Sequence, residues 1–349
     1  MTNPVPASEP PSGPVRSGRP GGLLLLAVAI LLAAAYAVAG DMREVARLLD
    51  RTEWSRLPLA FLLTAVSYGC ASVALVVLGS AMGISAPAGP MLRIALVSIS
   101  VNNLVSFGGV AGYSLRAALS RPHGVVAGHS FAMSLTHAYL NNLVMFVLLA
   151  LTLFQLVGDP TLDDAWRQAL AAAGVLAVVF AVLTSAALFS RRVRGALIRL
   201  GIRLSRHLPG RWASASASAL GEVDEALARA SVAFRQRPMA MGWPVALLCV
   251  QWAAMAGAFS SCLRTFTGPV DWVTVISGFS IGAVAGFASL LPGGIGVQDG
   301  SQAAVLTLRG VPLEVAVLAA LLFRLVYYVG PFVLTLPLYA SLLRRRQEG

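Results

Sequence analysis

The chain has 349 residues, of which 57% are hydrophobic and 12% charged, and its formal net charge is +11. Soluble domains carry about 25% charged residues, so this chain has too little charge to cover a soluble globule of its length. Its basic residues are all arginines and lie in tails and loops beside apolar runs, which is the positive-inside pattern and not a nucleic-acid-binding face. These observations predict an all-α integral membrane protein with no nucleic-acid partner.

The N-terminal residues 1–20 are rich in proline, serine and glycine, which predicts a disordered cytoplasmic tail. The first apolar run, Leu23 to Ala39, follows two arginines. It is longer than the apolar region of a usual signal peptide, although Ala37-Val38-Ala39 resembles a cleavage site. We interpret the run as a retained membrane helix at the start of a transmembrane domain that covers residues 21–345.

Five later apolar runs each have the roughly 20 residues that are needed to cross the hydrocarbon core. They are Leu57–Met82, Ala132–Leu156, Leu170–Phe189, Trp243–Cys262 and Leu313–Leu343. The last run contains Pro331 and Pro337, which predict a kink or a tilt.

Two other apolar segments, Ile94–Val110 and Val273–Leu291, do not read as plain spans, because polar and glycine residues interrupt or end them. Each resembles two half-helices around a break, which membranes tolerate only where protein or a polar cavity satisfies the backbone. The alternative is a full helix that ends in a loop at its glycine pair. The residues that would break the two hairpins are Gly108, Gly109, Pro292, Gly293, Gly294 and Gly296.

The distribution of charge predicts the orientation of the chain. Residues 190–241 form an arginine-rich stretch that suits a cytoplasmic loop, either solvated or held against anionic lipid headgroups. The loop Asp159–Asp164 is acidic and suits the outside, whereas Arg344–Arg346 suits the inside. Six full crossings fit these sides only if both broken segments are re-entrant, with the first entering from the cytoplasm near residues 94–120 and the second from outside near 273–308. Both termini are then cytoplasmic, in the plasma membrane of a bacterium.

The chain also shows an internal duplication. Gly108-Gly109 matches Gly293-Gly294 at a shift of 185 residues, and the span that begins near Leu57 matches the one near Met241. The halves, about 21–156 and 167–345, would each contain two crossings, a hairpin and a third crossing. Three crossings is an odd number, so the second half would be inverted, and transporters with inverted repeats bind their substrates near the membrane midplane.

Polar residues cluster around the two hairpins, where a charge at bilayer depth costs about 2.5–3.5 kcal/mol and therefore has a partner or a role. The candidate substrate-binding residues are Asn102, Asn103, Arg116, Gln298, Asp299, Glu314 and Arg324. Asp299 is the best partner for Arg324, and this pair would either hold the hairpin in place or bind a lipid, with the arginine on the phosphate and the acid on a cationic headgroup.

The sequence contains none of the catalytic or metal-binding motifs that would indicate an enzyme. We therefore predict no enzymatic activity, no cofactor and no metal. His129 and His137 could relay protons, because histidine titrates near neutral pH, or could be packing residues. The sequence does not decide between these two roles.

The stretch Leu291–Gly300 (LPGGIGVQDG), followed by Leu308–Arg324 (LRGVPLEVAVLAALLFR), resembles the lysylphosphatidylglycerol synthase transmembrane, or flippase-like, family. That family typically shows PGGxG, an acidic residue, GVP and an arginine in the final helix. The earlier Asn102-Asn103, with the first glycine pair and Arg116, is similar to the family's first motif.

The resemblance implies a multi-pass flippase domain that moves phospholipids, in some members aminoacylated ones, between leaflets. By position, Asp299 would be the motif acid and Arg324 the helix arginine. The chain departs from the family at His137-Ala138, where relatives often have an acidic residue and an arginine. It also ends at Gly349, which predicts a stand-alone member without the soluble synthase domain, with a membrane phospholipid and an enzyme that modifies this lipid as expected partners.

The leading functional prediction is a phospholipid translocase. The alternatives are a membrane scaffold or accessory subunit for a lipid or cell-envelope enzyme, and a small-solute transporter. A solute carrier would need a closed polar pocket, whereas a cavity that opens sideways into the bilayer would favour a lipid.

Overall fold

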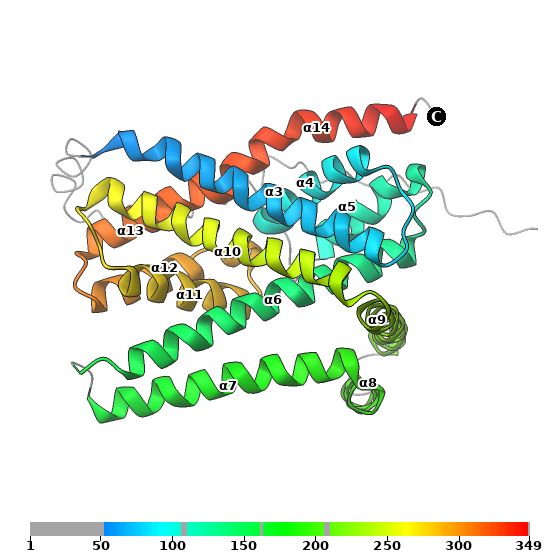
Figure 1. Cartoon of the computed structure of the whole chain (residues 1–349), viewed down its shortest axis with the longest axis horizontal. Coiled ribbons are helices and arrows are strands. Elements are labelled where there is room, and N and C mark those ends of the chain that lie inside the picture. The colour runs from blue at the N-terminus through cyan, green and yellow to red at the C-terminus, as the bar shows by residue number, and fades with distance from the viewer. Residues whose placement is uncertain (1–51, 106–109, 161–162, 206–209, 348–349) are drawn as a thin grey trace, which may run out of the picture.

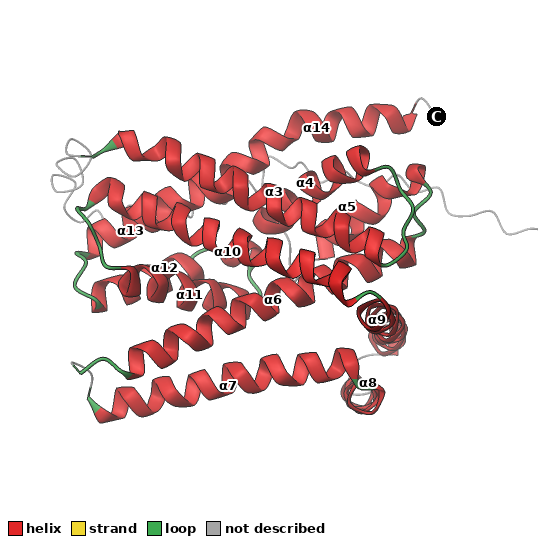
Figure 2. Ribbon diagram, viewed as in Figure 1, coloured by secondary structure: helices red, strands yellow, loops and turns green. Residues whose placement is uncertain are grey.

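The structure is a computed structural model that describes residues 52–105, 110–160, 163–205 and 210–347. Within these ranges all regular elements are helices and no strand occurs (Figure 2). Five apolar helical stretches there are long enough to cross a membrane: Trp54–Ala81, Ala127–Val157, Arg167–Phe189, Pro238–Phe266 and Leu313–Arg344. The chain is therefore a multi-pass membrane protein. These stretches match five of the six expected crossings, while Leu23–Ala39 lies outside the described residues and the count of six stays a prediction.

Two long helices form the centre of the bundle. The short 3-10 turn η2 (Trp54–Arg56) leads into α3 (Leu57–Ala81), which packs along α10 (Pro238–Phe266) (Figure 1). Aromatic rings fill the core beside them, with ring centroids 5.3 Å apart for Phe259 and Phe323 and for Phe323 and Tyr327. The helices α6 (Ala127–Val157) and α7 (Asp164–Phe189) pack together on one flank.

The two segments that the sequence predicts to be broken each form a pair of short helices. The first pair is α4 (Ala88–Val105) and α5 (Val110–Ser120), followed by the 3-10 turn η3 (Arg121–His123). It begins six residues before the expected Ile94, and Gly108 and Gly109 lie outside the described residues. The second pair is α11 (Trp272–Ala288) and α12 (Val297–Leu308), joined through the 3-10 turn η4 (Pro292–Gly294). The pairs lie at opposite ends of the bundle (Figure 1).

The last apolar stretch is not a uniform helix. It consists of α13 (Leu313–Arg324), the π-helical segment η5 (Leu325–Val329) and α14 (Gly330–Gln347). The two prolines of this run predict a kink or a tilt, and the irregularity in the structure is the π-helical segment just before Pro331. Proline has no N–H, so the Tyr327 carbonyl four residues earlier loses its helical donor. The Tyr68 hydroxyl donates to this carbonyl instead, at 3.0 Å.

The arginine-rich stretch over 190–241 connects two of the long apolar helices and is itself largely helical, whereas its cytoplasmic location stays a prediction. It contains α8 (Arg191–Ser205) and α9 (Gly210–Gln236), which Figure 1 shows end-on while the long helices lie in its plane. Both helices therefore run across the bundle axis at one end. The buried Arg194 of α8 donates through Nε to Asp224 of α9 at 2.5 Å and so holds the two together.

Candidate substrate cavity

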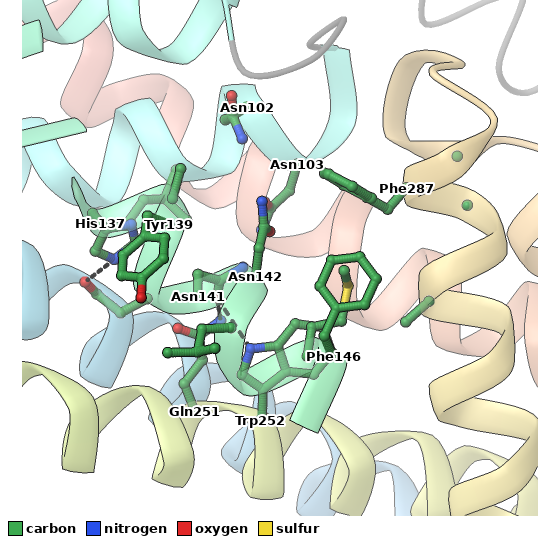
Figure 3. A pocket seen from close by; sticks show the side chains of 18 of the residues that line it. Asn102, Asn103, His137, Tyr139, Asn141, Asn142, Phe146, Gln251, Trp252 and Phe287 are labelled. Atoms are coloured by element: carbon green, nitrogen blue, oxygen red, sulfur yellow. Dashed lines mark hydrogen bonds between the residues drawn. The ribbon is translucent and has the colours of Figure 1, made fainter. Parts of the chain in front are cut away.

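A cavity of about 670 Å³ lies in the interior of the bundle and is partly open to the outside of the molecule. Both hairpins contribute to its wall, together with α3, α6, α7, α9, α10 and η5. Figure 3 shows Asn102 and Asn103 on one side, Gln251 and Trp252 on the other, and Asn141 and Asn142 between them. Side chains that lie far apart in the sequence thus meet in one cavity, where several amides stand among a mostly apolar lining.

The turn η4 of the second hairpin touches the end of α4 in the first hairpin beside this cavity. Gly293 in η4 has a φ of +58°, and a Cβ atom built on it would lie 2.8 Å from the Asn103 carbonyl and 3.1 Å from the Leu104 carbonyl. Real Cβ atoms essentially never show contacts below 3.0 Å, so only glycine fits here. This position explains one of the glycines that the sequence analysis assigned to the break.

Hydroxyl and amide groups form a continuous network along one wall. The amide of Asn103 donates to the Tyr68 hydroxyl at 3.0 Å, which in turn donates to the Tyr327 carbonyl. The Ser67 hydroxyl donates to the Gln251 carbonyl at 3.1 Å and lies 2.8 Å from the Tyr327 hydroxyl. Polar groups at this depth are therefore held by neighbours from α3, α4, α10 and η5.

A second set of hydrogen bonds joins α10 to α6. Gln251 Nε2 and Trp252 Nε1 both donate to Asn141 Oδ1, at 3.0 and 3.1 Å. The neighbouring Asn142 lines the cavity and has no hydrogen-bond partner among the described residues. Neither Gln251 nor Trp252 is among the site residues predicted from the sequence. A glutamine within the apolar run of α10 was the available signal, since buried polar groups need partners.

Arg116 of α5 lines the cavity and is only 2% exposed. Its Nε donates to the Ser98 hydroxyl at 3.1 Å and its Nη1 to the Ser134 hydroxyl at 2.7 Å. Both acceptors are neutral, and the side chain forms no ion pair with any described residue. The first hairpin therefore places a buried cation, with no described carboxylate as its partner, at the cavity wall.

Asp299 and Arg324 pair with each other, as the sequence predicts, at 2.7 Å between Oδ1 and Nε. The second carboxylate oxygen accepts from the backbone N–H of Gly296 at 3.0 Å, and Arg324 Nη1 donates to the Gly293 carbonyl at 2.9 Å. The guanidinium also lies 4.8 Å from the ring centroid of Tyr328. These contacts tie α12, η4 and the end of α13 together, and neither charged residue is among those that line the cavity.

The other sequence-predicted residues divide between the cavity and the ends of the bundle. Asn102, Asn103 and Gln298 line the cavity with Arg116, and Gln298 exchanges hydrogen bonds with the Tyr328 hydroxyl at 2.9 and 3.0 Å. Glu314 lies in the first turn of α13, outside the lining.

The two histidines also separate. His129 is exposed in the first turn of α6 and does not line the cavity. His137 does line it, and its Nε2 lies 3.2 Å from the Ala71 carbonyl. Because a carbonyl only accepts, Nε2 carries the proton in this contact.

The part of the cavity wall at the tip of the second hairpin is apolar and exposed. Phe287, Leu290 and Leu291 line the cavity, and their exposed fractions are 44%, 68% and 46%. Leu290 has a φ of +54°, which is rare for a residue with a branched side chain. The cavity thus combines polar groups on part of its wall with an apolar margin that is exposed.

A family model described as "Lysylphosphatidylglycerol synthase TM region" matches residues 22–335. Curated relatives include the phosphatidylglycerol lysyltransferases of Staphylococcus aureus strains COL and N315, each 34% identical over 88 residues. This stretch is 25% of the present chain and 10% of each relative, so the chain matches a small part of those proteins. The family match covers most of the sequence, and the chain belongs to the lysylphosphatidylglycerol synthase transmembrane family.

Proposed function

We propose that the protein is a phospholipid translocase that moves a lipid between the leaflets of a bacterial plasma membrane. The observation that carries this proposal is the cavity, which has a polar wall where the hairpin tips meet and an exposed apolar margin formed by Phe287, Leu290 and Leu291. A lipid needs both surfaces, because its headgroup is polar and its chains stay in hydrocarbon. The relatives are phosphatidylglycerol lysyltransferases, whose name refers to a phospholipid, and this supports the same class of substrate.

The lengths of the short helices support re-entrant hairpins. The helices α11 and α12 have 17 and 12 residues, which is about 26 and 18 Å at 1.5 Å per residue. A span must cross about 30 Å of hydrocarbon. We therefore propose that each hairpin enters from one side and returns to it, which preserves the topology of six crossings.

The register of the helices supports an inverted repeat. Helix α4 begins at Ala88 and α11 at Trp272, 184 residues later, while the two hairpins lie at opposite ends of the bundle (Figure 1). Ser67 and Gln251, also 184 residues apart, are hydrogen-bonded to each other. Contact between equivalent residues is what a two-fold axis between the halves would produce.

The basic helices support the proposed orientation. Helix α8 lies at the end of the bundle where α14 finishes (Figure 1), and its exposed arginines are Arg191, Arg192, Arg199 and Arg203. An amphipathic helix that runs across the bundle suits the membrane surface, and positive charge suits the cytoplasmic face. Cysteine labelling should then reach position 215 from inside and position 162 from outside, and the reverse result would contradict this orientation.

The contacts of Asp299 and Arg324 support a bracing role for the pair more than direct headgroup binding, because both carboxylate oxygens already have partners within the protein. A scaffold would need no polar cavity, and a closed solute pocket would not have exposed leucines along its margin. An enzyme that modifies the transported lipid remains the partner that we propose from the family.

Reconstitution into liposomes with fluorescent phospholipids tests the proposal. The wild type should expose inner-leaflet lipid to an external quencher faster than empty liposomes do. Asn142→Trp should slow this exchange by filling the cavity, whereas Leu334→Trp, on an exposed position of α14, should not. We expect Asp299→Asn and Arg324→Ala to insert but translocate poorly. Wild-type protein that behaves as empty liposomes do would contradict the function.

A further inference from the structure

The charges at the cavity indicate which headgroup it accepts. Among the described lining residues Arg116 is the one permanently charged group, and none is an aspartate or a glutamate. Asp299 follows the lining residue Gln298 in the chain, but Arg324 and the Gly296 N–H occupy both of its oxygens. A cationic headgroup would therefore meet an arginine and no free described carboxylate.

Arg116 has the properties of a site prepared for an anion. The guanidinium has five N–H donors, and described side chains accept from two of them, at Ser98 and Ser134. The side chain is 2% exposed, so it is largely removed from the solvent that would otherwise stabilise its charge. A buried charge without a counter-ion is costly, and an anion that enters the cavity would remove this cost.

Phosphate fits this arrangement better than a carbonyl or hydroxyl ligand would. Two parallel N–H donors of an arginine match two phosphate oxygens, and such charge-assisted pairs are shorter and stronger than neutral hydrogen bonds. The amides of Asn102 and Asn142 line the same cavity and can donate to further headgroup oxygens.

We propose that the cavity selects phospholipids with a net negative headgroup, with Arg116 as the ligand of the phosphodiester, and discriminates against lipids whose headgroup carries an amine. This inference rests on the proposed translocation of phospholipids and specifies its substrate class. It assigns anion binding to the first hairpin, whereas Asp299 of the second hairpin already has Arg324 of α13 as its partner.

Lipid binding to the purified full chain, measured by native mass spectrometry, tests the selection. The probes are phosphatidylglycerol, phosphatidylcholine and lysyl-phosphatidylglycerol, with glycerol 3-phosphate and inorganic phosphate as competitors. We expect phosphatidylglycerol to bind about tenfold more tightly than the lysyl lipid. Arg116→Gln should remove this preference, and Arg93→Gln, an exposed arginine in α4 of the same hairpin, should preserve it.

Each outcome bears on one proposal. Equal or tighter binding of the lysyl lipid, or an unchanged preference in folded Arg116→Gln, would overturn the selection of anionic lipids. If soluble phosphate competes as strongly as a phospholipid does, the ligand of Arg116 is a free phosphate and not a lipid headgroup. If Arg116→Gln does not fold, the order in which the wild type binds the three lipids still tests whether the cavity selects anionic lipids. If the lipids bind in the expected order but the liposome assay shows no transport, the proposed translocation is contradicted and the selection of anionic lipids is not.

Discussion

The two hairpins use similar backbones in different ways. In the first, Arg116 is held by neutral serine hydroxyls, and Gly112 of α5 lets Asn102 of α4 approach. In the second, the glycine lies on the opposite arm, where Gly286 of α11 accommodates Gln298 of α12, and the arginine is paired with Asp299. Asp299 of the second hairpin is thus paired with a cation of the protein, while Arg116 of the first has no carboxylate partner among the described residues. The difference suggests that the second is the brace and the first the binding element.

The largest expected effect is the loss of the brace. Asp299→Ala should lower the free energy of unfolding by about 3 kcal/mol, because it leaves Arg324 buried without its counter-ion. Thermal unfolding of the purified protein in nanodiscs measures the change. The double variant Asp299→Leu/Arg324→Met should recover much of this loss, since no unpaired charge is left. A single variant that unfolds at the wild-type temperature would show that the pair is no brace.

Replacing one packed glycine in each hairpin with alanine should destabilise the protein by different amounts. A Cβ atom on Gly112 would lie 2.6 Å from Asn102 Cβ and 2.8 Å from the Ser98 carbonyl, whereas on Gly286 it would meet the Gln298 side chain at 2.8 Å. We expect Gly112→Ala to cost about 2 kcal/mol and Gly286→Ala about 1 kcal/mol, because the first Cβ atom would clash with both Asn102 and the Ser98 backbone, whereas the second would clash below 3.0 Å with Gln298 Cβ alone. Thermal unfolding compares the two variants. In the first hairpin Asn102→Gly should partly rescue Gly112→Ala, and the reverse order of the two losses would refute this packing argument.

The helix that follows each hairpin differs too, because α6 is continuous where the last span contains a π-helical segment before Pro331. Tyr68→Phe should cost about 1–2 kcal/mol by leaving the Tyr327 carbonyl without a donor. In the Pro331→Ala background, which restores a backbone N–H, the same change should cost less. A double-mutant cycle on unfolding measures this coupling, and strictly additive losses would argue against it.

The smallest expected effect concerns pH. Asp271 caps α11 by accepting from the Thr274 N–H at 2.9 Å, whereas Pro87 precedes α4. Partial burial raises the pKa of Asp271, but hydrogen bonds from Thr274 and the charge of Arg309 outweigh it, so its pKa lies below the ordinary value. The cap, worth about 0.5–1 kcal/mol, is therefore present at neutral pH and is lost as the pH falls through this lowered pKa.

Unfolding of Asp271→Asn as a function of pH tests this assignment. The amide keeps an acceptor for the cap but does not titrate, so the variant should lose the part of the acid-induced decline that belongs to Asp271. If Asp271→Asn loses stability at low pH just as the wild type does, other groups cause the loss of stability in acid.

The sequence predicted the long helices because apolar runs of about 20 residues have few other stable forms in a membrane protein. It also predicted the second hairpin and the pairing of Asp299 with Arg324, since PGG and two isolated charges are strong local signals. It missed the helices α8 and α9, whose polar composition suits a loop as well. It also missed Tyr68, Gln251 and Trp252, because only tertiary packing brings α3 and α10 to the cavity. The fully buried Arg116 could be named from the sequence, but its neutral surroundings could not.

The contact at Gly293 has a consequence for the whole molecule. The backbones of η4 and of the end of α4 approach each other there with no side chain between them. A methyl group at this position would act as a wedge, and it would displace the tips of both hairpins together and not just the one that carries it.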